Sequence, residues 1–451
     1  MSFSGLLSNW LEQNNNTTNI DENQIRQKLG YSQNQWNSLT TQERETKINQ
    51  FNGDSSIKKE NSPLVNNNNS NNSNNSSLEQ KSNNASTDQP QQATNVGPQF
   101  EFDRYLLSWM RSTNTSFLIS SYKTHKVFSI GFIRDKSDNK DKLSLWITNF
   151  NRPMGIHADK KTAWISSSGN LWRFENSGKY IDDNPENKLG EFDANYIPRM
   201  AYFSNDIDAH DICVDKDNNP YYCSALFGVV CTPSESHSFK VHWRPPWLSK
   251  IAPEDRCHLN GICSRDGVPR YITAVCKSDV RGAWREKRIG KGIAFDIVEN
   301  KEVCGGLTMP HSPRWANDKL WILDAGTGYL GYVDFETKEL VRKVFIPGYL
   351  RGLSFVGQKY AVVGSSEDRN ESTFQGLPLG DKLKEEGINA KCGMYVINLE
   401  TFDIIHHMNF FAPANELYDV VALPGISRPK LTDVGDEKNM REYKIDYNGF
   451  Q

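Results

Sequence analysis

Ten polar residues begin short apolar segments between residues 99 and 428, and their types suit a binding site. They are Arg152, His210, Asp211, His258, Asn260, His311, Arg314, Arg351, Glu416 and Asp419. Guanidinium and imidazole groups bind carboxylates and phosphates, whereas carboxylate and amide oxygens bind cations. Gathered on one axis, these side chains predict a site for a small polar or anionic ligand or a short peptide. The other interpretation is a self-satisfied polar network that fills the axis.

The elements that must position these residues are short strands. Residues 117–122, 127–132 and 143–147 are apolar segments between turn residues, and helical periodicity is confined to a polar insertion at 381–386. One unit, a polar cluster followed by an apolar strand, a tight turn and an aromatic-rich strand, recurs six times. The six units begin at residues 153, 210, 260, 312, 351 and 418.

This spacing, about 40 to 65 residues, is the scale of propeller blades. We therefore predict an all-β fold, a β-propeller with six blades whose first strands line a central channel. The ten polar residues then lie near one mouth of that channel. Residues 117–147 should supply outer strands of the closing blade and the rest of the first blade.

Composition divides the 451 residues into four segments. Residues 1–53 are weakly helical and are either a docking module for a protein partner or two marginal helices. Residues 54–98 form an Asn/Ser/Gln-rich, low-complexity linker that we expect to be disordered. Residues 99–428 form the propeller, and residues 429–451 a C-terminal tail.

Several motifs in the propeller region resemble a family known as domain of unknown function 4915. The motifs are residues 257–261, 309–315, 326–328, 347–352, 373–379 and 416–420, in that order. The likeness spans about residues 105–430 and implies no activity, because none is established for the family. It also implies that the first hundred residues are an addition specific to this protein.

A metal site is a second hypothesis. Asp211, Asn260 and Glu416 are similar in outline to the Asp, Asn and Glu of a calcium-dependent lactonase with six blades. That likeness implies a metal-dependent hydrolase or lyase, in which the metal would activate water. The additional His and Arg residues depart from the pattern, because an arginine repels a cation. The sequence therefore leaves the cofactor undetermined.

Other motifs have structural explanations. Residues 326–331 spell a dinucleotide-binding pattern but lead into a strand, which predicts a hairpin. Residues 215–219 predict a turn rather than a calcium loop. The basic, aromatic segment 281–288 is either a solvated loop or an anion-attracting one. The stiff segment 243–247 either covers the channel mouth or packs between blades.

The net charge of −3 gives no reason to expect binding to nucleic acid or to an anionic membrane. The eight cysteines all follow residue 200 in apolar segments, which predicts reduced core residues rather than disulfides. The start of the sequence lacks the pattern of a secretory signal, and no long apolar run predicts a transmembrane helix. Together these features favour a cytoplasmic protein. A pure interaction scaffold is a third hypothesis for its function.

Overall fold

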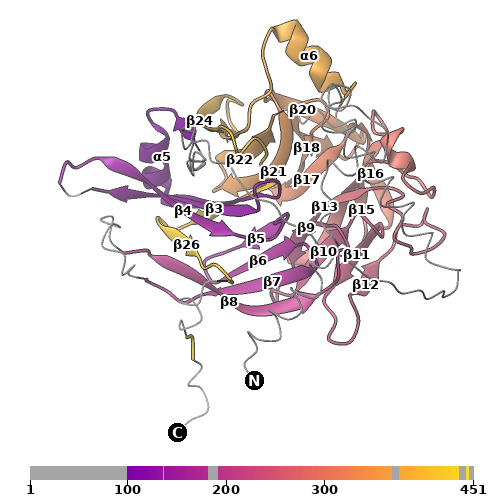
Figure 1. Cartoon of the computed structure of the whole chain (residues 1–451). Helices are drawn as coiled ribbons and strands as arrows, with labels where there is room; N and C mark the ends of the chain where they lie inside the picture. Colours follow the sequence, from indigo (N-terminus) through magenta and orange to yellow (C-terminus); the bar gives the residue numbers. More distant parts are fainter. Residues whose placement is uncertain (1–98, 136, 181–190, 368–374, 436–442, 446–451) are drawn as a thin grey trace, which may run out of the picture. The chain divides into compact units, whose positions relative to one another are not determined.

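The computed structural model describes residues 99–135, 137–180, 191–367, 375–435 and 443–445 (Figure 1). The expectations for residues 1–53 and 54–98 lie outside this range. Strands dominate the described residues, and they assemble into six sheets. Within this part of the chain, no helix is long and apolar enough to cross a membrane.

Each sheet is one blade with at least four antiparallel strands. Blade 1 contains β5 (Ile156–Ala158), β6 (Thr162–Ser167), β7 (Asn170–Asn176) and β8 (Ala194–Phe203). Blade 2 contains β9 (Ala209–Val214), β10 (Pro220–Ser224), β11 (Val229–Thr232) and β12 (Lys240–Trp243). Blade 3 contains β13 (Leu259–Arg265), β14 (Val268–Ala274), β15 (Gly292–Asp296) and β16 (Lys301–Leu307).

The second half of the ring is built in the same way. Blade 4 contains β17 (Pro310–Ala316), β18 (Lys319–Asp324), β19 (Tyr329–Asp334) and β20 (Glu339–Phe345). Blade 5 contains β21 (Tyr349–Val356), β22 (Tyr360–Ser366), β23 (Gly393–Asn398) and β24 (Ile404–Phe410). Blade 6 combines β25 (Asp419–Pro424) with β2 (Thr115–Ser121), β3 (Lys126–Arg134) and β4 (Asp141–Asn149).

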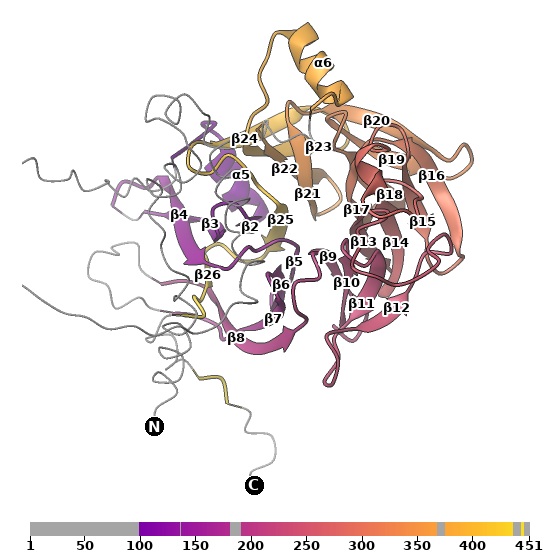
Figure 2. The same cartoon turned by 45° about the vertical axis from the view of Figure 1, so that its right-hand side comes forward.

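The innermost strands β5, β9, β13, β17, β21 and β25 lie side by side around the centre (Figure 2). Each of them coincides with one of the six repeated units of the sequence. The prediction of a six-bladed propeller is therefore confirmed. Stacking in a ring gives every blade two neighbours, so the apolar faces of all six sheets are covered.

The ring is closed by strands from both ends of the domain. The late strand β25 pairs with the early strand β2, with Val420 opposite Ile119. All strands between residues 115 and 149 belong to this closing blade, so the expectation that they also complete the first blade is wrong. Two short strands reinforce the closure: β1 (Phe100–Phe102) extends blade 5, and β26 (Pro429–Leu431) extends blade 1 in parallel with β8. The propeller thus reaches Leu431, three residues past the boundary at 428 drawn from the sequence.

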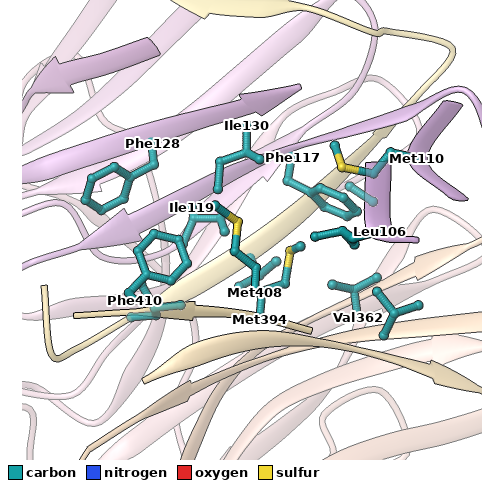
Figure 3. Close-up of a cluster of buried hydrophobic side chains, with 14 of the residues drawn as sticks. Leu106, Met110, Phe117, Ile119, Phe128, Ile130, Val362, Met394, Met408 and Phe410 are labelled. Carbon is teal, nitrogen blue, oxygen red and sulfur yellow. The ribbon is translucent and has the colours of Figure 1, made fainter. Parts of the chain in front are cut away.

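A helix missed by the sequence analysis, α5 (Leu106–Thr113), packs where blades 5 and 6 meet. Its buried residues Leu106 and Met110 join apolar side chains of both blades in one cluster (Figure 3). The labelled partners are Phe117, Ile119, Phe128 and Ile130 of blade 6 and Val362, Met394, Met408 and Phe410 of blade 5. This shared core, rather than helical propensity, accounts for a helix of only eight residues.

The other local expectations have clear outcomes. Helix α6 (Pro378–Glu386) covers the predicted polar insertion, and residues 326–331 form the turn of the β18–β19 hairpin and the start of β19. Trp243 and Trp247 both contact Phe295, with ring centroids 5.5 and 5.4 Å apart, so the stiff segment packs between blades 2 and 3. All eight cysteines are buried and free, as predicted.

Candidate functional site

A buried ion pair links inner strands of different blades. Arg314 of β17 faces Asp211 of β9 in a bidentate arrangement, with N···O distances of 2.8 and 3.1 Å. Asp419 of β25 lies 3.6 Å from the same guanidinium. The Nε of Arg314 donates to the carbonyl oxygen of Leu353 at 3.1 Å. We call Asp211, Arg314 and Asp419 the ion-pair layer.

Backbone N–H groups complete the coordination of the two carboxylates. Asp211 accepts hydrogen bonds from Ile212 and Ile262, and Asp419 accepts them from Ile156 and Val420. Burial raises the pKa of Asp419 to about 7; Arg314 opposes this rise and the neighbouring Asp211 adds to it. These contacts tie the inner strands of all six blades together, and the layer has the self-satisfied character of a plug.

Aromatic and imidazole rings form a second layer, built from residues that precede the ion-pair layer along the inner strands and from Trp284 of the segment between β14 and β15. The ring of His210 lies 4.9 Å from that of His258 and 5.8 Å from that of Tyr418. His258 stacks on Trp284, with centroids 4.0 Å apart. Arg351 lies over the ring of Tyr418 at 4.8 Å. We call His210, His258, Trp284, Arg351 and Tyr418 the His–Arg mouth.

Acidic residues orient both imidazoles of the mouth. The Nε2 of His210 lies 3.1 Å from Asp208, and the Nδ1 of His258 lies 3.0 Å from Asp255. Asp255 also accepts a hydrogen bond from the indole Nε1 of Trp284 at 2.5 Å. Burial lowers the pKa of His258, and Asp255 opposes this shift. A histidine fixed through one ring nitrogen presents the other nitrogen in a defined direction. The Nε2 of His258 makes no hydrogen bond to any described residue.

Arg351 is the least compensated charge of the mouth. Its side chain is more than nine-tenths buried, yet within the described ranges its guanidinium forms no ion pair and no hydrogen bond. Its position depends on Gly352, which adopts a φ of +77° and approaches β25 so closely that an added Cβ would lie 2.3 Å from the nitrogen of Val420. Only glycine tolerates both conditions.

Two of the remaining predicted residues, Asn260 and Arg152, lie beside this cluster. The Oδ1 of Asn260, an acceptor, lies 3.3 Å from the Nδ1 of His210, and its Nδ2 donates to the carbonyl of Pro310. Arg152 pairs with Asp206 and Asp208 at 3.0 and 3.1 Å. Burial raises the pKa of Asp208, but His210, His258 and Arg152 outweigh it and hold that pKa below its usual value. His311 is buried on β17, next to the strand irregularity between His311 and Arg314.

The three residues proposed for a metal do not fit one. Both oxygens of Asp211 face Arg314, the oxygen of Asn260 faces His210, and Glu416 accepts hydrogen bonds from Ser121 and the N–H of Lys123. A guanidinium bound to the carboxylate repels a cation at the same place. Across the described ranges, no group of three or more His, Cys, Asp or Glu side chains is arranged to hold a metal ion.

The other side of the ion-pair layer contains a cavity of about 250 Å³ that the sequence analysis did not predict. All six inner strands line it, through residues that follow the layer along each strand. They include His157, Ser264, Trp315, Ser354 and Phe355, with Arg314 at the inner end. Recognising this cavity requires knowing how six strands close around an axis, which no single segment encodes.

Trp284 and Tyr418 are also functional candidates that were not predicted. Trp284 comes from the basic segment 281–288, whose aromatic residue was the available signal; the tryptophan is buried while Arg285 remains exposed. Tyr418 directly precedes Asp419 and takes the place before the ion-pair layer that His210 occupies on β9.

Comparison with solved structures finds distant likenesses. The chain resembles a nidogen/laminin complex structure at 12% identity, over 70% of this chain and 99% of that one, with a TM-score of 0.40. It resembles virginiamycin B lyase from Staphylococcus aureus at 13% identity, over 55% and 73% of the two chains, with a TM-score of 0.31. A gluconolactonase from Xanthomonas campestris matches at 10% identity, over 65% and 84%, with a TM-score of 0.37. Likenesses at these TM-scores identify no function.

Comparison with protein families gives a specific result. A search of curated proteins found no match. The family model described as domain of unknown function (DUF4915) matches residues 104–432, which include the inner strands of all six blades and both polar layers. The resemblance carried by the sequence motifs is confirmed, and the chain belongs to the DUF4915 family.

Proposed function

We propose that the propeller binds a small organic anion, with a carboxylate or phosphate group, at the His–Arg mouth. The observation that carries this proposal is the uncompensated guanidinium of Arg351. A buried charge without a partner is costly, so proteins normally pair it. A planar guanidinium offers parallel N–H donors to a carboxylate or phosphate, which supplies the absent partner.

The carboxylates beside the His–Arg mouth are already bound to other groups, so a ligand is needed to neutralise Arg351. Asp208 is engaged by Arg152 and His210, and Asp255 by His258 and Trp284. The positive charge of Arg351 therefore has no carboxylate among the described residues to neutralise it. The Nε2 of His258 offers a second polar contact. The rings of Tyr418 and Trp284 offer apolar contact, which favours an anion with an organic body over a bare inorganic ion.

The alternatives receive less support. A metal-dependent hydrolase or lyase requires Asp211 as a ligand, and Arg314 already occupies it. The scaffold hypothesis predicts a polar plug without a cavity. This channel contains a plug, the ion-pair layer, and also a cavity. A partner for residues 1–53 stays a prediction. We also propose a cytoplasmic location, because eight buried free cysteines suit a reducing compartment.

The test measures ligand-induced stabilisation of the full chain. Thermal unfolding with succinate, citrate or inorganic phosphate should show a higher midpoint for at least one of them, weaker at high salt. Arg351→Ala should weaken that binding at least about tenfold, since a hydrogen bond to a charged group contributes about 1.5–3 kcal/mol. Arg351→Lys should retain part of it.

Arg173→Ala is the matched control, because Arg173 also lies over an aromatic ring, that of Trp164 at 5.4 Å, but in blade 1. This variant should bind as the unaltered protein does. Equal binding by Arg351→Ala, or no stabilisation by any of the three anions, would contradict the proposal.

A further inference from the structure

The cavity beyond the ion-pair layer differs chemically from the His–Arg mouth. Its inner end is Arg314, whose guanidinium is already held by Asp211, Asp419 and the carbonyl of Leu353. The carboxylates belong to the same layer and are saturated by backbone N–H groups. No charge at this end of the channel is left for a ligand of opposite sign, so the lining favours an uncharged molecule.

His157 is the polar group that this lining leaves available. It lies on β5 beside the cavity, and its ring makes no hydrogen bond to the residues that the structure describes. Burial, and then the nearby Arg314, lower the pKa of His157 to about 4. At neutral pH the ring is therefore uncharged, with one N–H donor and one nitrogen acceptor.

Each of the two serines of the wall makes a hydrogen bond to the backbone of a neighbouring strand. The Oγ of Ser264 donates to the carbonyl of Val214 at 2.5 Å, and the Oγ of Ser354 accepts the N–H of Ala422 at 2.8 Å. These bonds fix the wall, whereas the imidazole of His157 faces an empty volume without a partner. Polar recognition in the cavity therefore centres on the ring of His157, with the hydroxyl of Ser354 as a second donor.

Aromatic side chains supply the apolar part of the wall. Trp315 stacks on Tyr271 with centroids 5.7 Å apart and carries Arg265 on its ring at 4.1 Å, so it is held in place before any ligand arrives. Phe355 contributes from the neighbouring strand β21. A preformed aromatic wall with one polar group is typical of small-molecule sites. The volume of about 250 Å³ lies below that of common drug-sized sites, which limits the ligand to a small molecule.

We propose that this cavity is a second binding site, for a small uncharged molecule that hydrogen-bonds to His157 and packs an apolar body against Trp315 and Phe355. The site is independent of the His–Arg mouth, because the ion-pair layer separates the two. One channel thus presents two mouths with different ligand chemistry.

The test compares three probes that share one ring and differ in charge: benzamide, benzoate and benzylammonium. The protein is labelled with 5-fluorotryptophan, and the fluorine resonance of Trp315 is assigned with Trp315→Phe. Benzamide should shift this resonance in a saturable way, and the two charged probes should not. His157→Phe, which keeps the ring but loses its nitrogens, should weaken benzamide binding by up to about tenfold, the effect of one hydrogen bond.

Two controls make the result specific. His242→Phe changes an exposed histidine on β12 and should bind benzamide as the unaltered protein does. Arg351→Ala should also leave benzamide binding unchanged, which separates this site from the anion site. The proposal is wrong if benzamide shifts nothing, if the charged probes bind equally well, or if His157→Phe binds as tightly as the unaltered protein.

Discussion

Two arginines of the same channel differ in what surrounds them. Arg314 faces two carboxylates and donates to the carbonyl of Leu353, whereas Arg351, more deeply buried, has the ring of Tyr418 as its one charge contact among the described residues. The first arrangement pairs the guanidinium with carboxylates of the protein itself and links the inner strands of all six blades. The second leaves a charge that an external anion can neutralise. Burial alone therefore does not separate a structural arginine from a binding one; the available partners do.

The largest expected effect comes from breaking the ion-pair layer. Arg314→Met should lower the free energy of unfolding by about 3–5 kcal/mol, because it leaves two buried carboxylates without a cation. Urea denaturation of the full chain measures this change. Arg134→Met, which removes an exposed ion pair with Asp141, should cost less than about 1 kcal/mol. Similar small losses for both variants would show that the layer is not structural.

The second effect is the pH dependence that Asp419 gives to the layer. Its pKa is about 7 in the folded protein and about 4 in the unfolded chain, so between these values the folded state binds more protons. The free energy of unfolding should therefore fall as pH rises from 4 to 7, by at most about 1.4 kcal/mol per pH unit from this group.

Asp419→Asn isolates this contribution, because it keeps the shape and removes the titration. The difference in unfolding free energy between the unaltered protein and Asp419→Asn should depend on pH across that window. The two proteins must be compared because His157, whose pKa is lowered to about 4, changes the free energy of unfolding in the opposite direction. The stabilisation from the neutral His157 is lost as pH falls below about 6.5. A pH-independent difference would contradict the raised pKa of Asp419.

The smallest effect on stability is expected at the mouth. Arg351→Met removes an uncompensated charge as well as its contact with Tyr418, so the free energy of unfolding should change by less than about 1 kcal/mol. Binding of the anion should nevertheless be lost, as expected where stability and function trade against each other. A loss as large as that of Arg314→Met would make Arg351 a structural residue and remove the distinction between the two arginines.

The sequence predicted the inner strands well because each blade repeats a local pattern, and polar residues before Asp211 or Asp419 are visible without a structure. It could not show which charges neutralise each other. Asp211 and Arg314 are 103 positions apart and meet only because the ring brings β9 and β17 to one axis. For the same reason Arg351 looked equivalent to Arg314, and the cavity beside His157 was not foreseen.

Helix α5 and Trp284 were missed for different reasons. The eight residues of α5 carry too short a periodicity to predict a helix, and blades 5 and 6 supply its stability. Trp284 belongs to a loop between β14 and β15, and its contact with His258 depends on the path of that loop. Both features depend on contacts between residues far apart in the sequence, and local propensity does not predict them.

The most direct test of the account is the behaviour of the Nε–H groups of the two arginines, observed by nitrogen-15 NMR and assigned with Arg314→Lys and Arg351→Lys. The Nε–H of Arg314 donates to Leu353, so it should exchange slowly with water and should not respond to anions. The Nε–H of Arg351 should exchange faster and shift in a saturable way with the anion that stabilises the protein. Equal protection of the two groups, with no response of Arg351 to any anion, would contradict the central claim.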